Sequence, residues 1–200
     1  MSALLLSFIW GWEEAFPGSR IVVFILYFGL GALRHARLRE MPSDLGLGVR
    51  DWRPALRNIT ILVVPVSAVV LAIGAALGSL HFPSWERSLL GLAWVAIWGI
   101  AQQYGLLCFF YRGFVEILKS PGFATAASAV IFAVFHAPNP FLMVVTLGAG
   151  VIACVLYRLS PNVILIGVAH GAISYVLYYA LPESITHGLR VGPGYYSTLH

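Results

Sequence analysis

Long apolar runs constrain this chain more than any other feature of its sequence. Several of them approach or exceed the ~18–20 residues that a helix needs to cross a bilayer. A segment within lipid must satisfy its own backbone hydrogen bonds, so each run is predicted to be helical. The fold class is therefore an all-α, polytopic transmembrane bundle of six or seven helices, in one integral membrane domain over residues 1–200. The predicted spans lie near 21–34, 59–79, 88–111, 123–137, 140–157 and 162–181, with 3–16 as a seventh, partial segment.

The composition excludes a soluble globular domain and a nucleic-acid-binding protein. Hydrophobic residues make up 60% of the chain and charged residues only 10%, against about 25% charged residues in soluble domains. The net charge of +4 comes from basic residues beside the spans, where membrane topology explains them. Cys108 and Cys154 both lie within apolar runs, so no disulfide framework is indicated. The lipid bilayer is the surrounding that this composition implies.

The distribution of arginine predicts the topology. The loop 34–58 is rich in arginine and should lie on the cytoplasmic side. Alternation of the spans then places Arg112 and Arg158 on the same side and the C-terminus on the other. Within the loop, residues 43–58 mix leucine and tryptophan with arginine, which is typical of a segment that lies along the membrane surface. The C-terminal residues 187–200 are expected to be irregular and exposed.

Three predicted spans carry polar side chains at membrane depth, where such groups usually face the bundle interior or a watery cavity. At ~1.5 Å of rise per residue, Gln103, Cys108, His136, His170 and Ser174 lie ~15–22 Å from the cytoplasmic ends of their helices. They could therefore line one cavity, and this common depth is the main argument for a site. The polar side chains are those of Gln102, Gln103, Cys108 and Arg112 on the third long helix, and of His136 and Asn139 at the end of the next helix. The last two are His170 and Ser174, which lie one helical turn apart on the span 162–181.

Each of these residues also has a purely structural explanation. A histidine in a span can bond a neighbouring helix, and adjacent glutamines can join helices by hydrogen bonds. Cys108 can be a small apolar filler, Arg112 can mark the cytoplasmic interface, and Ser174 can bond its own helix. The two histidines and the glutamine pair are harder to explain together than singly.

Two histidines on neighbouring helices are candidate ligands of a divalent metal such as zinc, or groups that polarise a water molecule. Hydrolysis also needs a base, usually a carboxylate, that activates this water. From residue 59 to residue 181 the predicted spans contain no Asp or Glu except Glu116, at the cytoplasmic end of its helix.

At these residues the chain resembles the CPBP intramembrane proteases, also called the CAAX-protease or abortive-infection family. The family pattern is a Glu-Glu pair followed by Arg-Gly, then Phe-x-x-x-His, then His-x-x-x-Asn, on successive helices. Phe132-Ala-Val-Phe-His136 matches the second motif, and His170-Gly-Ala-Ile-Ser174 matches the third with Ser in place of Asn. The resemblance covers residues 42–181. It implies a multi-pass protein of the bacterial inner membrane that hydrolyses peptide bonds within the membrane.

The first motif departs from the family pattern, and two alignments compete. Anchoring on Arg112-Gly113 places Leu107 and Cys108 where the glutamates belong. Anchoring on the distance to His136 places Gln102 and Gln103 there, which keeps polar groups for polar groups. In either alignment the water-activating glutamate of the family is missing. An amide cannot accept a proton near neutral pH, although Ser174 could still donate a hydrogen bond to an oxyanion.

These observations leave two main hypotheses and one minor hypothesis. The first is a divergent CPBP-like endopeptidase of membrane-embedded peptides or proteins, with His136 and His170 around an activated water or a metal ion. The second is a catalytically inactive member that serves as a binding or scaffold subunit of a membrane complex. The minor one makes Cys108 a nucleophile with His170 and Arg112, which would require a lowered thiol pKa.

Overall fold

The computed structural model describes residues 2–12, 16, 20–48 and 52–199. These residues form helices and connecting turns without a strand, so the predicted all-α class is confirmed. The helices are α1 (Ser2–Ser7), η1 (Phe8–Trp12), α3 (Arg20–Leu38), α4 (Trp52–Ala76), α5 (Trp85–Gln103), η2 (Tyr104–Tyr111), α6 (Arg112–Leu118), α7 (Pro121–Val134), α8 (Pro140–Leu159), α9 (Val163–Ala180), α10 (Glu183–Thr186), η3 (His187–Leu189) and α11 (Pro193–Tyr196).

Four helices in the described part of the chain are long and apolar enough to cross a membrane. They are α4, α8, α9 and one continuous helix from Trp85 to Leu118 that joins α5, η2 and α6. The predicted spans 21–34 and 123–137 form helices α3 and α7, which are not among these four. With 14 residues, α7 is shorter than the roughly 20 residues that a full crossing needs.

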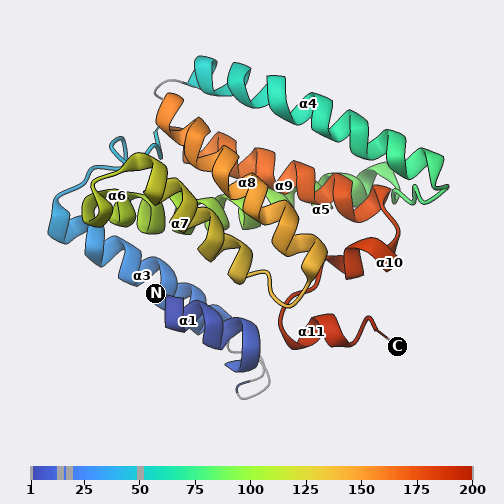
Figure 1. Cartoon of the computed structure of the whole chain (residues 1–200), viewed down its shortest axis with the longest axis horizontal. Helices are drawn as coiled ribbons and strands as arrows, with labels where there is room; N and C mark the ends of the chain where they lie inside the picture. The colour runs from blue at the N-terminus through green and yellow to red at the C-terminus, as the bar shows by residue number, and fades with distance from the viewer. Residues whose placement is uncertain (1, 13–15, 17–19, 49–51, 200) are drawn as a thin grey trace.

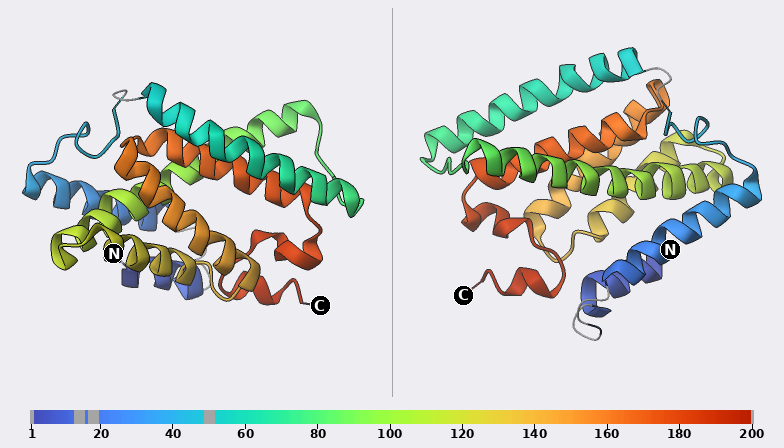
Figure 2. Two further views of the ribbon diagram at one scale, coloured as in Figure 1. Left: turned by 45° about the horizontal axis from the view of Figure 1, so that its top comes forward. Right: turned by 180° about the vertical axis from the view of Figure 1, so that it is seen from behind.

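The first predicted segment, 3–16, falls partly outside the described residues, because residues 13–15 are not described. Its described part forms α1 and η1, which lie beside α3 in both views of the chain (Figures 1 and 2). The predicted surface segment 43–58 does not form a separate element. Its last residues begin α4, and its first residues form turns that pack against the membrane helices.

Helices α5 and α9 form the centre of the bundle, with α4 along one edge and α3 along the opposite edge (Figure 1). Glycines allow this central pair to pack closely. A Cβ atom at Gly99 would collide with the carbonyl of Gly167, and one at Gly171 would collide with the backbone of Val95. The buried apolar core lies next to this pair, around η2 and the facing sides of α7, α8 and α9, and includes Leu107.

Replacing Gly171 by alanine is expected to lower the melting temperature in detergent, because the added methyl group forces α5 and α9 apart. Overpacking of this kind costs about 1–3 kcal/mol of unfolding free energy. The matched control is Gly113→Ala, because a Cβ atom at Gly113 meets nothing within 4 Å. Equal melting temperatures for the two variants would contradict the close packing of α5 on α9.

Side-chain caps fix where α7, α8 and α9 begin. The Ser120 hydroxyl accepts a hydrogen bond from the backbone N–H of Phe123, and Asn139 and Asn162 accept equivalent bonds from Leu142 and Leu165. Such caps satisfy N–H groups that a helix leaves unpaired at its start. They also set the tight turn 135–139, which carries His136 between α7 and α8.

The C-terminal segment differs from its prediction as an irregular, exposed tail. Residues 187–199 form η3 and α11 and, together with the preceding helix α10, lie against the turn between α7 and α8 (Figures 1 and 2). Thr186 is buried, and Leu189 contributes to the walls of two cavities. This packing was not predicted, because the hydrogen bonds that join the segment to the turn involve backbone groups of the segment.

Candidate functional site

Five of the predicted site residues line one cavity of about 660 Å³. This cavity, here called the histidine cavity, lies between α4, α5, α8 and α9 and reaches the turn after α7. Its volume falls in the range of ligand-binding pockets, about 300–1,000 Å³. Their common membrane depth had predicted that these side chains share one cavity. The five residues are Gln102, Gln103, His136, His170 and Ser174.

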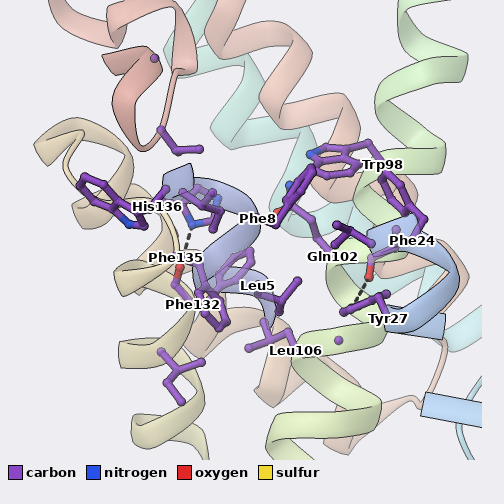
Figure 3. A pocket seen from close by; sticks show the side chains of 18 of the residues that line it. Leu5, Phe8, Phe24, Tyr27, Trp98, Gln102, Leu106, Phe132, Phe135 and His136 are labelled. Carbon is purple, nitrogen blue, oxygen red and sulfur yellow. Dashed lines mark hydrogen bonds between the residues drawn. The ribbon is translucent and has the colours of Figure 1, made fainter. Parts of the chain in front are cut away.

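The hydrogen bond of His136 determines which of its ring nitrogens is free. Its Nδ1 lies 2.7 Å from the backbone carbonyl oxygen of Phe132 (Figure 3). Because a carbonyl can only accept, Nδ1 carries the proton and donates it. In the neutral ring, Nε2 then keeps a lone pair that can accept a proton or bind a metal ion.

Phe132 joins the two histidines through its ring. The ring centroid of Phe132 lies 4.8 Å from that of His136 and 5.7 Å from that of His170. Phe132 itself is buried within α7. The Phe-x-x-x-His spacing thus places the phenyl ring against one imidazole, and folding brings the second imidazole to the same ring.

Both glutamines carry unused hydrogen-bonding capacity. The amide oxygens of Gln102 and Gln103 are buried and have no hydrogen-bond partner among the described residues. Gln103 is only 1% exposed. A buried acceptor without a partner is costly and usually indicates a missing donor. A water molecule or a substrate N–H group in the histidine cavity would supply that donor.

Ser174 lines the histidine cavity, but its hydroxyl donates to the carbonyl oxygen of His170 at 2.9 Å. This is the bond to its own helix that the sequence allowed as an alternative. The hydroxyl proton would have to leave that carbonyl before Ser174 could donate to an oxyanion.

A second cavity, of about 530 Å³, lies on the other side of Gln102 and His136. It is called the aromatic cavity here, since Phe8, Phe24 and Phe135 contribute to its walls (Figure 3). Four residues line both cavities, namely Trp98, Gln102, His136 and Leu189. Neither Trp98 nor Leu189 is among the residues predicted from the sequence. Trp98 could have been found, because it precedes Gln102 by one helical turn and shares its face.

Arg112 does not lie at the histidine cavity. Its Nε donates to the Glu40 carboxylate at 3.1 Å, and its Nη1 donates to the carbonyl of Asp44 at 3.0 Å. His35 Nδ1 lies 2.7 Å from the same carboxylate. Arg112 therefore holds the loop after α3 against the continuous helix Trp85–Leu118. It does not line the histidine cavity, where a supporting role was predicted for it.

The cluster of His35, Glu40 and Arg112 makes the stability of the fold depend on pH in the acid range. Burial alone would raise the pKa of the Glu40 carboxyl, but hydrogen bonds from His35 and Arg112 outweigh burial and hold the pKa below its ordinary value. A carboxyl with a lowered pKa stabilises the folded state above its unfolded pKa. This contribution is lost as the pH falls through the lower pKa of the folded state.

Cys108 and Asn139 also lie outside the walls of both cavities. Cys108 is fully buried, and its Sγ donates to the carbonyl oxygen of Leu45 at 3.4 Å. Asn139 is fully buried and caps α8. Because Cys108 and His170 do not share a cavity, the cysteine-nucleophile hypothesis lacks the contact that it requires.

The two competing alignments of the first motif differ in what they bring to the histidines. Gln102 and Gln103 line the histidine cavity, whereas Leu107 and Cys108 are fully buried in the core. Between Gln103 and Arg112 the chain forms the π-helix η2, from Tyr104 to Tyr111, which contains Leu107 and Cys108. Such wide turns occur frequently at functional sites. The geometry favours the alignment on the glutamines.

The donor set fits a zinc site poorly. His136 and His170 supply two imidazoles, whereas catalytic zinc usually takes three protein ligands of the His, Asp, Glu or Cys type. The described residues contain no group of three such side chains that could hold a metal ion. No Asp or Glu lines either cavity in the described part of the chain.

One comparison with known proteins gives a match. Residues 84–176 match the family model described as Rce1-like, type II CAAX prenyl endopeptidase Rce1-like. This segment runs from the start of α5 into α9 and contains all five residues of the histidine cavity listed above. No curated protein and no solved structure matches the chain.

Proposed function

We propose that the chain, whose residues 84–176 match the Rce1-like family model, is a CPBP-type intramembrane endopeptidase whose nucleophilic water is held between His136 and His170. The observation that carries this proposal is the histidine cavity, which collects polar groups from α5, α9 and the turn after α7. Its substrate is a membrane-embedded peptide or protein. We also propose that the loop 34–58 faces the cytoplasm, in keeping with its arginines.

In this mechanism His136 is the general base. Its neutral Nε2 takes a proton from the water as the water oxygen attacks the carbonyl carbon of the scissile peptide bond. The resulting imidazolium is stabilised by the Nδ1–H bond to the Phe132 carbonyl. When the C–N bond breaks, Nε2 returns the proton to the leaving amine. The peptide bond and one water molecule become a carboxylic acid and an amine, so the step is balanced.

The remaining groups orient the water and stabilise charge. The amide oxygens of Gln102 and Gln103 accept hydrogen bonds from the water or from substrate N–H groups, which satisfies their unpaired state. In the proposed mechanism their amide nitrogens donate to the developing oxyanion. His170 lines the same cavity and is the second polarising group. The proposed steps need no metal ion.

The second candidate function is a binding subunit without catalysis. The observation that favours it is the lack of a carboxylate in the walls of both cavities, as far as the structure describes the chain. Such a protein would hold a peptide in the histidine cavity or join partner membrane subunits, and would release no product.

The deciding experiment is a cleavage assay with purified protein in liposomes. The substrates are a prenylated peptide with a CAAX-type C-terminus and the same peptide without the prenyl group, with products identified by mass spectrometry. The proposal expects cleavage by the wild type and loss of cleavage in His170→Ala. His81→Ala is the control, because His81 lies in the loop before α5 and lines neither cavity. Binding of the peptide without cleavage by the wild type would favour the second candidate.

A strong chelator is expected to leave the cleavage rate within about twofold of the untreated rate, because the two imidazoles fall one ligand short of a zinc site. The assay is the liposome assay above, before and after dialysis against the chelator. Loss of activity with recovery on adding zinc would show that a third ligand exists and that the water mechanism is wrong.

A further inference from the structure

Three hydrogen bonds connect the turn that carries His136 to the C-terminal segment. The Asn139 side-chain amide donates to the carbonyl oxygens of Thr186, at 3.0 Å, and Arg190, at 3.1 Å. The backbone N–H of Gly192 donates to the carbonyl of Ala137 at 2.9 Å. Residues 186–192, called the C-terminal clamp here, thus hold both ends of the sequence 137–139, directly after His136.

Burial makes these bonds effective. Asn139 is 0% exposed and Thr186 is 1% exposed. The oxygen of the Asn139 amide is also used, since it accepts from the N–H of Leu142 and caps α8. Asn139 therefore joins α8 and the clamp through one side chain, and breaking its bonds would leave the carbonyl of the buried Thr186 unpaired.

The clamp also reaches the candidate site directly. Leu189 lines both the histidine cavity and the aromatic cavity, as His136 does. Its φ of 53° lies in the left-handed region, which is unfavourable for a leucine. Such a backbone persists when the surrounding structure holds it in place, and outliers of this kind cluster at functional sites. The hydrogen bonds on either side of Leu189, at Thr186 and Arg190, provide that hold.

We infer that the C-terminal clamp fixes the His136 turn in the geometry of the proposed reaction, and that Asn139 is the positioning residue that couples them. The catalytic part of this inference rests on the proposed function. The clamp lies outside the Rce1-like segment 84–176.

The test compares Asn139→Ser with Asn162→Ser. Both asparagines are buried caps that accept from the N–H three residues later, and serine preserves that type of cap. Only Asn139 also donates through its amide nitrogen to other backbone carbonyls within the described residues. The difference between the two variants therefore measures the clamp bonds and not the cap.

The first readout does not need catalysis. Diethyl pyrocarbonate acylates free imidazole nitrogens, and mass spectrometry follows His136 against the loop residue His81 as an internal reference. Asn139→Ser removes the bonds from the Asn139 amide to the carbonyls of Thr186 and Arg190. This loss should raise the rate of His136 modification about 10-fold, with little change in Asn162→Ser. Gly192→Ala should act in the same direction, because its Cβ would collide with the carbonyl of Ile9 and its φ is 57°.

The second readout is the cleavage assay, in which Asn139→Ser should lower kcat about 10-fold and leave KM nearly unchanged. Equal His136 modification in Asn139→Ser, Asn162→Ser and the wild type would overturn the inference. Faster modification in Asn139→Ser and Gly192→Ala, with no cleavage even by the wild type, would support the clamp and count against the proposed peptidase. If Asn139→Ser does not fold, Gly192→Ala decides the same question.

Discussion

Replacing His136 by alanine is expected to lower the rate of peptide cleavage by about 10²–10⁴-fold, the contribution of a general base. His136 is the group with a defined free lone pair at the site, since its Nδ1 proton is committed to the Phe132 carbonyl. Among the described residues, no carboxylate lines either cavity, so none is placed to replace His136 as the base. The measurement is the initial rate in liposomes under single-turnover conditions.

Two controls separate chemistry from folding in this experiment. The melting temperature of His136→Ala should stay close to that of the wild type. The ring faces a cavity, and its Nδ1 bonds the Phe132 carbonyl of the preceding helix α7. His81→Ala should retain full activity, since it removes an imidazole that lines neither cavity. Wild-type rates in a well-folded His136→Ala variant would eliminate His136 as the base.

The second imidazole should not contribute independently. His136 and His170 lie against the same Phe132 ring and share the histidine cavity. Residues that act as a unit are non-additive. The variant that lacks both histidines should therefore be about as slow as His136→Ala alone.

The apolar pattern predicted the fold because the bilayer dictates it. A lipid-facing segment must be both apolar and helical, and helices α4, α8 and α9 therefore lie close to their predicted spans. The predicted span 123–137 ended three residues too late, because α7 is Pro121–Val134. Pro138 and Pro140 flank Asn139, and α7 ends at Val134 before the turn that holds His136. The sequence showed the breakers but not how early the helix yields to the turn.

The position of the candidate site was predictable where its polar side chains stand out from apolar helices. Gln102, Gln103, His136 and His170 stand out as polar groups in apolar helices, and their common depth brought them to one cavity. Residues held by backbone carbonyls could not be assigned in this way. Cys108 bonds the carbonyl of Leu45, and Asn139 bonds carbonyls of the C-terminal clamp. A carbonyl is present at every residue, so the sequence carries no signal for which one is used.

Arg112 illustrates the same limit for an ion pair. Its partner Glu40 lies in the loop after α3, 72 residues earlier in the chain. An arginine at the end of an apolar run is equally expected at a membrane interface and at a site. Only the folded loop shows that Arg112 stabilises that loop, and this leaves the glutamine pair as the polar part of the helix that reaches the histidines.

Replacing Gln103 by glutamate is expected to raise the cleavage rate by about 10–100-fold, because a carboxylate can accept the proton that an amide cannot. Gln103 lines the cavity that holds both histidines, and its amide oxygen already lies there without a partner. The substitution changes charge but hardly changes shape. The measurement is the liposome assay with the prenylated peptide.

The matched control is Cys108→Glu, which tests the competing alignment of the first motif. Cys108 is fully buried and bonds the Leu45 carbonyl, so a glutamate there should destabilise the protein and should not raise the rate. A faster Cys108→Glu variant would reverse the assignment of the motif. If the wild type cleaves nothing but Gln103→Glu does, the site is intact apart from its base, and the natural chain is a binding protein on a protease scaffold. If Gln103→Glu folds and neither form cleaves, the histidine cavity is not a hydrolytic site.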